Sequence, residues 1–140
     1  MKSKTYTIII IISLTITLLA SCGVGADMGD PLEGTSWELM VYRKTSLVAG
    51  TTITASFEEG VMRGSAGCNG YNAQYEVSGD RFSIEVVAST LMACLDPEGV
   101  TEQEQFFLGF LTDADAFEIT DEQLIISRPD GETLTFVPAP

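Results

Sequence analysis

The chain has 140 residues, enough for one domain and too few for two of ordinary size. It carries 20 acidic and 7 basic residues, a net charge of −13, and no histidine. The acidic excess argues against nucleic-acid binding, because no basic patch is available to neutralise phosphates. The absence of histidine removes the commonest general base and the commonest zinc ligand. The composition therefore indicates a small, acidic, globular domain that is not an enzyme.

Residues 1–21 have the pattern of a secretory signal peptide. Lys2 and Lys4 give a positive start, residues 8–19 form a mostly apolar run, and small residues close the segment. This run is too short to cross a bilayer as a helix, which needs about 20 residues. The segment is therefore excluded from the fold.

The residue after this segment is Cys22, and Leu19-Ala20-Ser21-Cys22 resembles the bacterial lipobox. The resemblance implies that Cys22 is acylated and becomes the first residue of the mature chain. An ordinary signal followed by a free cysteine is the alternative. Two or three acyl chains give stable anchoring. We expect an envelope lipoprotein that faces the periplasm or the exterior. Because Gly23 rather than aspartate follows the cysteine, a Gram-negative cell would place it at the outer membrane.

Cleavage removes the two N-terminal lysines and no acidic residue, so the net charge of −13 becomes −15. Such a chain gains no attraction to anionic lipid, and the lipid on Cys22 would hold it at the membrane. Residues 22–31 are small and polar, and we interpret them as a flexible tether. Residues 32–138 are interpreted as the folded domain.

From residue 34 onward the apolar residues follow a period of two, as in half-buried strands. Turn signals separate these runs at residues 58–60, 78–80, 121–123 and 128–131. About eight short strands with frequent turns predict an antiparallel, barrel-like sheet. The clearest alternations place these side chains inward: Trp37, Leu39, Val41; Ile53, Ala55, Phe57; Phe82, Ile84, Val86.

One segment breaks this rhythm and predicts a helix. Asp96-Pro97 is expected to cap and start it, with proline at the first helical position. Its acidic early residues Glu98, Glu102 and Glu104 suit the helix dipole. The apolar side of the wheel carries Val100, Phe106, Phe107, Phe110 and Leu111, and the opposite side carries Thr101, Glu102, Gln105, Gly109 and Thr112. That stripe is wide enough to bury against a sheet.

Two cysteines, Cys68 and Cys94, remain once Cys22 is acylated. In an exported protein two such cysteines usually pair. The chain has no CxxC motif, and neither cysteine has a lysine beside it to activate a thiolate. We expect a structural disulfide that closes a loop of 27 residues, counting both ends. Two free or redox-active thiols are the alternative.

Four segments resemble the META domain of HslJ-like bacterial envelope lipoproteins. They are residues 34–39 (GTSWEL), 67–75 (GCNGYNAQY), 90–94 (TLMAC) and 104–111 (EQFFLGFL). Their order and spacing hold from about residue 32 to residue 137. The resemblance implies a mainly β, barrel-like fold with one helix. It also implies an envelope location and a part in envelope integrity, stress response and drug tolerance. No defined biochemical reaction accompanies it.

The second segment also has a local explanation. Asn69-Gly70 is a tight-turn signal, because both residues tolerate positive φ. Tyr71 and Tyr75 lie four residues apart and therefore on the same face of a strand. We interpret the motif as structural. A polar recognition edge formed by Asn69, Tyr71 and Tyr75 beside the cystine is the alternative.

No catalytic, metal or cofactor site is predicted. Lys44 is the sole lysine of the mature chain, and nothing in its surroundings in the sequence orients it as a base. Asp113 and Asp115 are spaced like the start of a calcium loop, but Glu118 stands where the EF-hand needs glycine. This departure leaves only a weak surface calcium site as an alternative.

We therefore expect a non-enzymatic, lipid-anchored binding or accessory module with an unknown protein partner or apolar ligand. One alternative is a carrier that holds a lipid or other apolar ligand inside the barrel. Another is a protein-binding inhibitor or assembly pilot. Exposed Met40, Met62 or Met92 would favour a partner surface, and a roomy apolar interior would favour the carrier. Seven phenylalanines are available to line or fill that interior.

Overall fold

A computed structural model describes residues 29–140. The predicted signal peptide and the predicted lipidation site, Cys22, lie outside the described residues. The predicted tether reaches residue 31, but Asp30 already belongs to the fold. Its carboxylate accepts a hydrogen bond from the Leu32 amide at 2.8 Å and another from the Tyr75 hydroxyl. The folded part therefore begins by Asp30.

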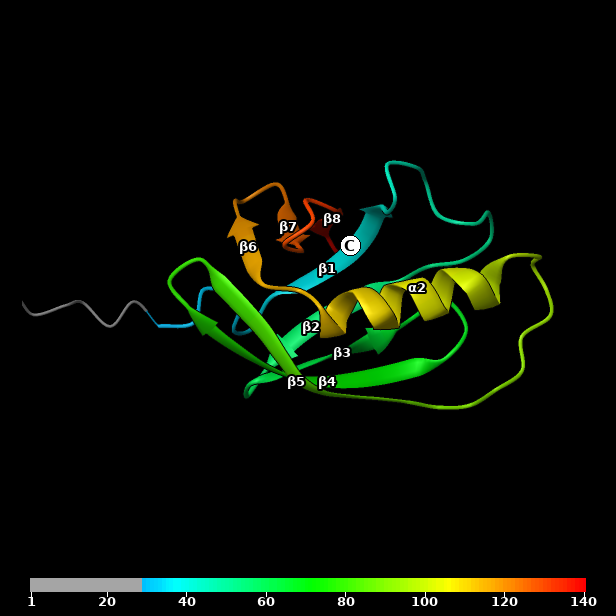
Figure 1. Ribbon diagram of the computed structural model, residues 1–140, viewed down its shortest axis with the longest axis horizontal. Helices are drawn as coiled ribbons and strands as arrows, with labels where there is room; N and C mark the ends of the chain where they lie inside the picture. Colours follow the sequence, from blue (N-terminus) through cyan, green and yellow to red (C-terminus); the bar gives the residue numbers. More distant parts are fainter. Residues whose placement is uncertain (1–28) are drawn as a thin grey trace, which may run out of the picture.

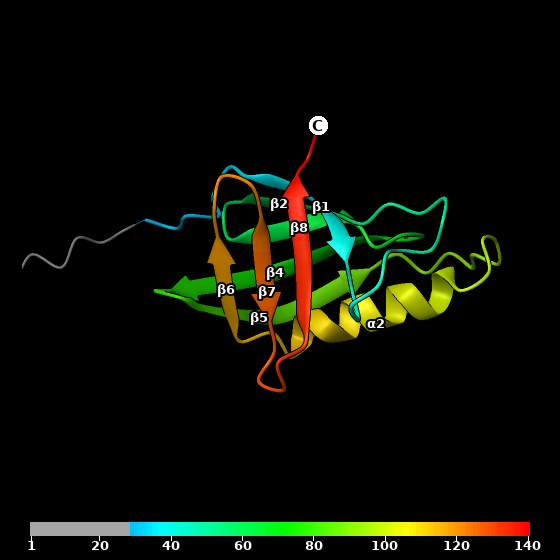
Figure 2. The same cartoon turned by 90° about the horizontal axis from the view of Figure 1, so that it is seen from above.

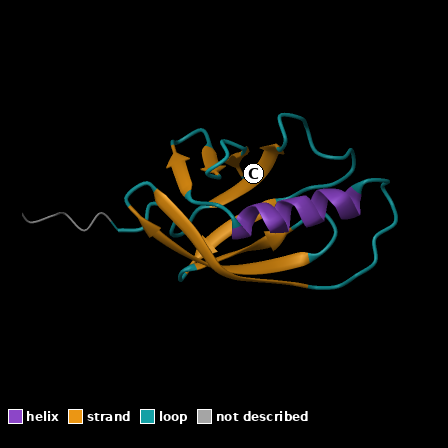
Figure 3. Cartoon of the chain, in the orientation of Figure 1, coloured by secondary structure: helices purple, strands orange, loops and turns teal. Residues whose placement is uncertain are grey.

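The described chain forms a mainly β domain with one helix, as the sequence predicts (Figures 1 and 3). Each strand pairs antiparallel with the next, and the last pairs with the first, which closes a barrel-like ring. Within residues 29–140, no helix has the length and apolar character needed to cross a membrane. The elements are β1 (Ser36–Val41), β2 (Thr54–Glu58), β3 (Val61–Ser65), β4 (Gly70–Ser78), β5 (Arg81–Ser89), α2 (Val100–Thr112), β6 (Ala116–Ile119), β7 (Leu124–Ser127) and β8 (Thr133–Pro138).

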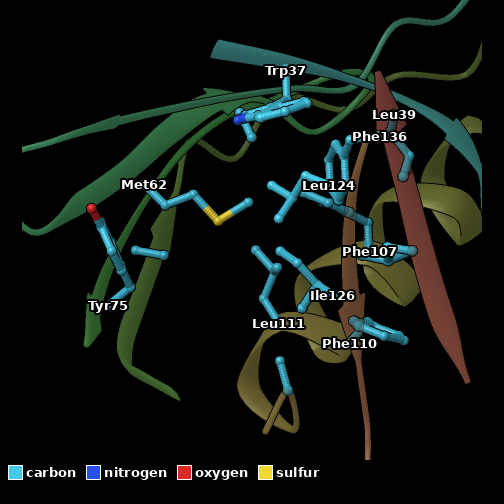
Figure 4. Close-up of a cluster of buried hydrophobic side chains, with 14 of the residues drawn as sticks. Trp37, Leu39, Met62, Tyr75, Phe107, Phe110, Leu111, Leu124, Ile126 and Phe136 are labelled. Atoms are coloured by element: carbon cyan, nitrogen blue, oxygen red, sulfur yellow. The ribbon is translucent and has the colours of Figure 1, made fainter. Parts of the chain in front are cut away.

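The core lies inside this ring and is filled by side chains from the strands and the helix. Figure 4 shows Phe107, Phe110 and Leu111 of α2 directed toward the side chains of β7 and β8. The large side chains with the least exposure are Leu32, Leu39, Ile53, Phe57, Met62, Phe82, Phe107, Phe110, Leu111, Leu124, Ile126 and Phe136. Burial of this apolar area is the main favourable contribution to folding.

Two predicted inward residues, Val41 and Val86, are instead exposed, by 38% and 58% of their surface. In both cases a bulge interrupts the alternation. The pairing of β1 with β8 shifts register between Leu39 and Val41, and the pairing of β4 with β5 shifts at Gln74 and Tyr75. An extra residue in one strand reverses which side chains face inward beyond it.

The helix begins at Val100, three residues later than the cap predicted at Asp96 and Pro97. The residue before it, Gly99, has φ of 90°, a left-handed conformation that a helix cannot contain. The Val100 amide donates to the Pro97 carbonyl at 3.2 Å, so Pro97 lies in a turn that precedes the helix. The predicted exposed face is confirmed: Thr101, Glu102, Gln105, Gly109 and Thr112 are all exposed.

The helix packs beside β4 and β5. Strands β5 and β6 pair in register only at Arg81 and Ala116. At the other end of β5, the Phe107 ring of α2 meets Tyr71 of β4, the partner of Ser89, edge-on at 5.2 Å. The Arg128 guanidinium after β7 lies 5.4 Å from the Phe110 ring. Figure 2 shows α2 alongside β5, away from β6. The helix therefore closes one side of the core.

Gly64 in β3 is a position where any side chain collides with backbone. A Cβ there would lie 2.1 Å from the Thr54 carbonyl oxygen. Gly64→Ala is therefore expected to lower the free energy of unfolding by about 3 kcal/mol, through a forced shift of two strands. Gly109→Ala is the matched control, because a Cβ at this exposed helical position meets nothing within 4 Å.

Urea denaturation of both variants measures the difference. The control is expected to gain up to about 1 kcal/mol, since alanine favours helix over glycine. A Gly64→Ala protein as stable as the wild type would show that the strands separate freely here.

Candidate binding surface

The predicted Asn69-Gly70 turn lies earlier in the chain. The Ala66 amide donates to the Asn69 carbonyl at 2.7 Å, which closes a turn over residues 66–69. The positive φ falls on Gly67, at 107°, and Gly70 is the first residue of β4. The prediction was wrong because the side chain of Asn69 is engaged elsewhere and its backbone already leads into the strand.

Asn69 is buried, with 3% of its surface exposed, and its amide group holds the segment that follows β5. Its Oδ1 accepts hydrogen bonds from the Met92 amide and the Thr90 hydroxyl, both at 2.7 Å. Its Nδ2 donates to the Met92 carbonyl at 3.2 Å. The side chain thus pairs with the Met92 backbone much as a neighbouring strand would.

The helix supplies the partner that fixes Asn69. Glu104 is 9% exposed, and its two carboxylate oxygens accept from the Asn69 amide at 2.6 Å and from Asn69 Nδ2 at 2.7 Å. Sequence analysis gave Glu104 only a role in the helix dipole. Its spacing from Val100, Phe107 and Leu111 places it on the apolar side of the wheel. A carboxylate in that stripe is the signal that reveals a buried polar contact.

The neighbouring helical residue fixes a second loop in the same way. Gln103 is 1% exposed, and its Oε1 accepts from the Val48 amide at 2.6 Å. Its Nε2 donates to the Thr51 hydroxyl at 2.9 Å. The first turn of α2 therefore holds residues 48–51 through Gln103 and residues 66–69 through Glu104. Sequence analysis missed both contacts.

The structure joins Cys68 and Cys94 in a disulfide, with Cα atoms 6.1 Å apart. The Thr101 hydroxyl of α2 also donates to the Cys94 carbonyl at 2.9 Å. Together with the hydrogen bonds between the Asn69 side chain and the Met92 backbone, these bonds fix residues 91–95, which we call the apolar loop. It is attached to the domain at two points, the Met92 backbone and Cys94.

The apolar loop presents hydrophobic side chains to solvent. Leu91 is 96% exposed, Leu95 is 90% exposed and Met92 is 61% exposed. Of the other methionines singled out in the sequence, Met40 is 48% exposed and Met62 is fully buried. Scattered exposed apolar side chains need no explanation, but three of them within a loop held by the buried Asn69 and a disulfide indicate an interaction surface.

Tyr71 and Tyr75 are core residues and form no recognition edge. The Tyr71 hydroxyl donates to the Thr54 carbonyl at 2.9 Å, and the Tyr75 hydroxyl donates to Asp30. Burial raises the pKa of Tyr71. Burial also raises the pKa of Tyr75, and the hydrogen bond to Asp30 and the negative charges of Asp30 and Glu33 add to the rise. Both side chains are neutral donors at physiological pH.

The carboxylates weighed for calcium binding contact arginines. Asp113 lies 3.6 Å from Arg128, and Asp115 lies 3.7 Å from Arg81. Among residues 29–140, no group of three or more His, Cys, Asp or Glu side chains is placed to hold a metal ion.

The apolar loop lies at the opposite end of the long axis from the start of the described chain (Figures 1 and 2). Asp96, Glu98 and Glu102 follow it in sequence, and all three are exposed. The sequence has no lysine or arginine between Arg81 and Arg128. The loop and the first turn of the helix therefore carry apolar and acidic side chains.

Comparisons with known proteins agree on the fold and carry no activity. A search of curated proteins gave no match. A solved structure from Burkholderia xenovorans is 26% identical, with a TM-score of 0.65 over 77% of this chain and 83% of that chain. A second NMR structure is 24% identical, with a TM-score of 0.61 over 76% of this chain and 91% of that chain. The sequence model of the META domain matches residues 30–140. The chain therefore belongs to the META domain family.

Proposed function

We propose that this protein is a non-enzymatic binding module of the cell envelope, anchored by lipid on Cys22, that takes a protein partner on its apolar loop. One observation carries the proposal: Leu91 and Leu95 are almost fully exposed on a loop that hydrogen bonds to the buried Asn69 and a disulfide hold in place. Exposing leucines on a fixed loop is unfavourable in water, and binding a partner relieves that cost. The part in envelope integrity, stress and drug tolerance belongs to the same proposal.

A partner surface is favoured over an apolar cargo inside the barrel. The aromatic side chains that would line a cavity are packed against one another, for example Phe57 on Tyr75 with ring centroids 5.1 Å apart and Phe82 on Phe117 with centroids 6.3 Å apart. Aromatic side chains that pack closely in a core occupy the space that a bound ligand would need. The exposed methionines Met40 and Met92 also suit an adaptable contact surface.

A complementation assay tests the proposal. Leu91→Ser combined with Leu95→Ser is expected to fold with unchanged stability and to fail to restore envelope-stress tolerance to cells that lack the protein. Val86→Ser, which removes an exposed apolar side chain from a strand, is the matched control and is expected to restore tolerance. Full restoration by the double variant would contradict the proposed surface.

Native mass spectrometry of residues 23–140, exported into an oxidising compartment, separates the carrier from the binding module. We expect a clean mass without an apolar adduct. A lipid or other apolar molecule that co-purifies would overturn the proposal in favour of a carrier.

Replacement of the proposed lipidation site tests the anchor. Cys22→Ser is expected to move the protein from the membrane fraction to the soluble fraction, because no acyl chain can then be attached. Cell fractionation with immunoblotting measures this, and Ser21→Ala, which keeps a small residue before the cysteine, is the control. A Cys22→Ser protein that stays with the membrane would contradict lipid anchoring.

A further inference from the structure

We propose, building on the proposed function, that the partner is a protein whose contact surface is an apolar pocket ringed by lysine or arginine. Three features occur together at one end of the domain: exposed leucines, acidic residues that follow them in sequence, and a fixed backbone.

The charged residues that follow the apolar loop in sequence are acidic as far as Arg128. Asp96 follows Leu95 directly, and Glu98 and Glu102 lie in the turn before the helix and in its first turn, all of them exposed. The carboxylate of Glu104 is turned inward and bound to Asn69, so it is not part of this surface. Opposite charges across an interface speed association and exclude wrongly charged partners. An acidic partner would be repelled, and a basic one is attracted.

The fixed backbone makes the leucines effective anchors. The Met92 backbone is bonded to Asn69 on both its amide and its carbonyl, and Cys94 is bonded to Cys68. A loop already held in one conformation loses little entropy on binding. Apolar anchors that fill a partner's pocket contribute most of the affinity, and the charged rim adds orientation and rate.

A membrane is a poorer occupant of the same surface. The seven residues from Cys22 to Met28 span at most about 25 Å, and they join the described chain at the end opposite the apolar loop. The mature charge, −13 with two lysines removed, also opposes contact with anionic lipid. The lipid anchor and the apolar loop therefore serve opposite ends of the molecule.

Site-specific crosslinking in cells tests the inference on the full-length protein. A photo-reactive benzoylphenylalanine replaces Ala93, which is exposed and lies between the anchors, or Val86 as the control position. We expect one protein adduct from position 93 and none from position 86.

With the captured protein purified, Leu91→Ser/Leu95→Ser is expected to raise the Kd for that protein at least tenfold. Raising salt from 50 to 200 mM is expected to weaken wild-type binding at least tenfold.

Neutralising the acidic residues separates charge from apolar contact. The triple variant Asp96→Asn/Glu98→Gln/Glu102→Gln is expected to bind at least fivefold more weakly at low salt and to lose most of the salt dependence. A captured protein whose affinity ignores both salt and this variant would overturn the basic partner and leave the proposed protein binding intact. Adducts with phospholipid alone or with a second copy of this chain, or no adduct, would overturn both.

Discussion

Asn69→Ala is expected to lower the free energy of unfolding by about 3 kcal/mol and to release the apolar loop. The side chain makes bonds to the Met92 backbone, to Thr90 and to Glu104, and alanine replaces none of them. The Glu104 carboxylate would keep only one of its two donors while it stays buried. A buried charged group without its partner is costly, and that cost dominates the expected loss. Chemical denaturation measures it.

Asn72→Ala is the matched control, because Asn72 is an exposed asparagine of β4 and is expected to change stability by less than about 0.5 kcal/mol. Glu104→Gln, alone and combined with Asn69→Ala, tests whether the two residues act together. We expect the losses to be strongly non-additive. Additive losses would mean that the Asn69–Glu104 contact contributes little to stability.

The cysteine pair gives the second large effect. Cys68→Ser is expected to lower the free energy of unfolding by roughly 3 to 4 kcal/mol, because the bridge closes a 27-residue loop in the unfolded chain. For a domain of this size the loss corresponds to a fall of roughly 15 °C in Tm. Cys94→Ser is expected to have the same effect. Thermal unfolding followed by circular dichroism measures both.

The double variant Cys68→Ser/Cys94→Ser distinguishes a bridge from two independent side chains. If one bond accounts for the effect, the double variant unfolds at the same temperature as either single variant. Reduction of the wild-type protein is expected to give the same Tm. Losses that sum across the two positions would contradict the disulfide.

Much of the fold follows from local patterns in the sequence. The alternations at Trp37 and Leu39, and from Ile53 to Phe57, predict buried faces because each strand has one side toward the core. The exposed face of the helix follows from its period. The pattern fails at Val41 and Val86, where a bulge reverses the faces, because bulges depend on pairing with another strand and leave no mark in the strand itself.

The candidate site was harder to predict for a different physical reason. Asn69 lies beside a glycine, and Asn-Gly is a strong turn signal, but contacts with Glu104 and Met92 decide its conformation. These partners are 35 and 23 residues away in sequence. Tertiary hydrogen bonds override local turn preference when the side chain is buried. The exposure of Leu91 and Leu95 likewise depends on contacts distant in sequence, because Asn69 and Cys68 hold the loop that carries them.

The proposed binding surface requires that hydrogen bonds to the buried Asn69 and the disulfide hold the apolar loop in one conformation before any partner binds. Amide hydrogen exchange at Met92, followed by NMR, tests it most directly, because this amide donates to the buried Oδ1 of Asn69. We predict that the Met92 amide of the wild type exchanges as slowly as amides of the core strands and becomes fast in Asn69→Ala. Fast exchange at Met92 in the wild-type protein would show a mobile loop and contradict the account.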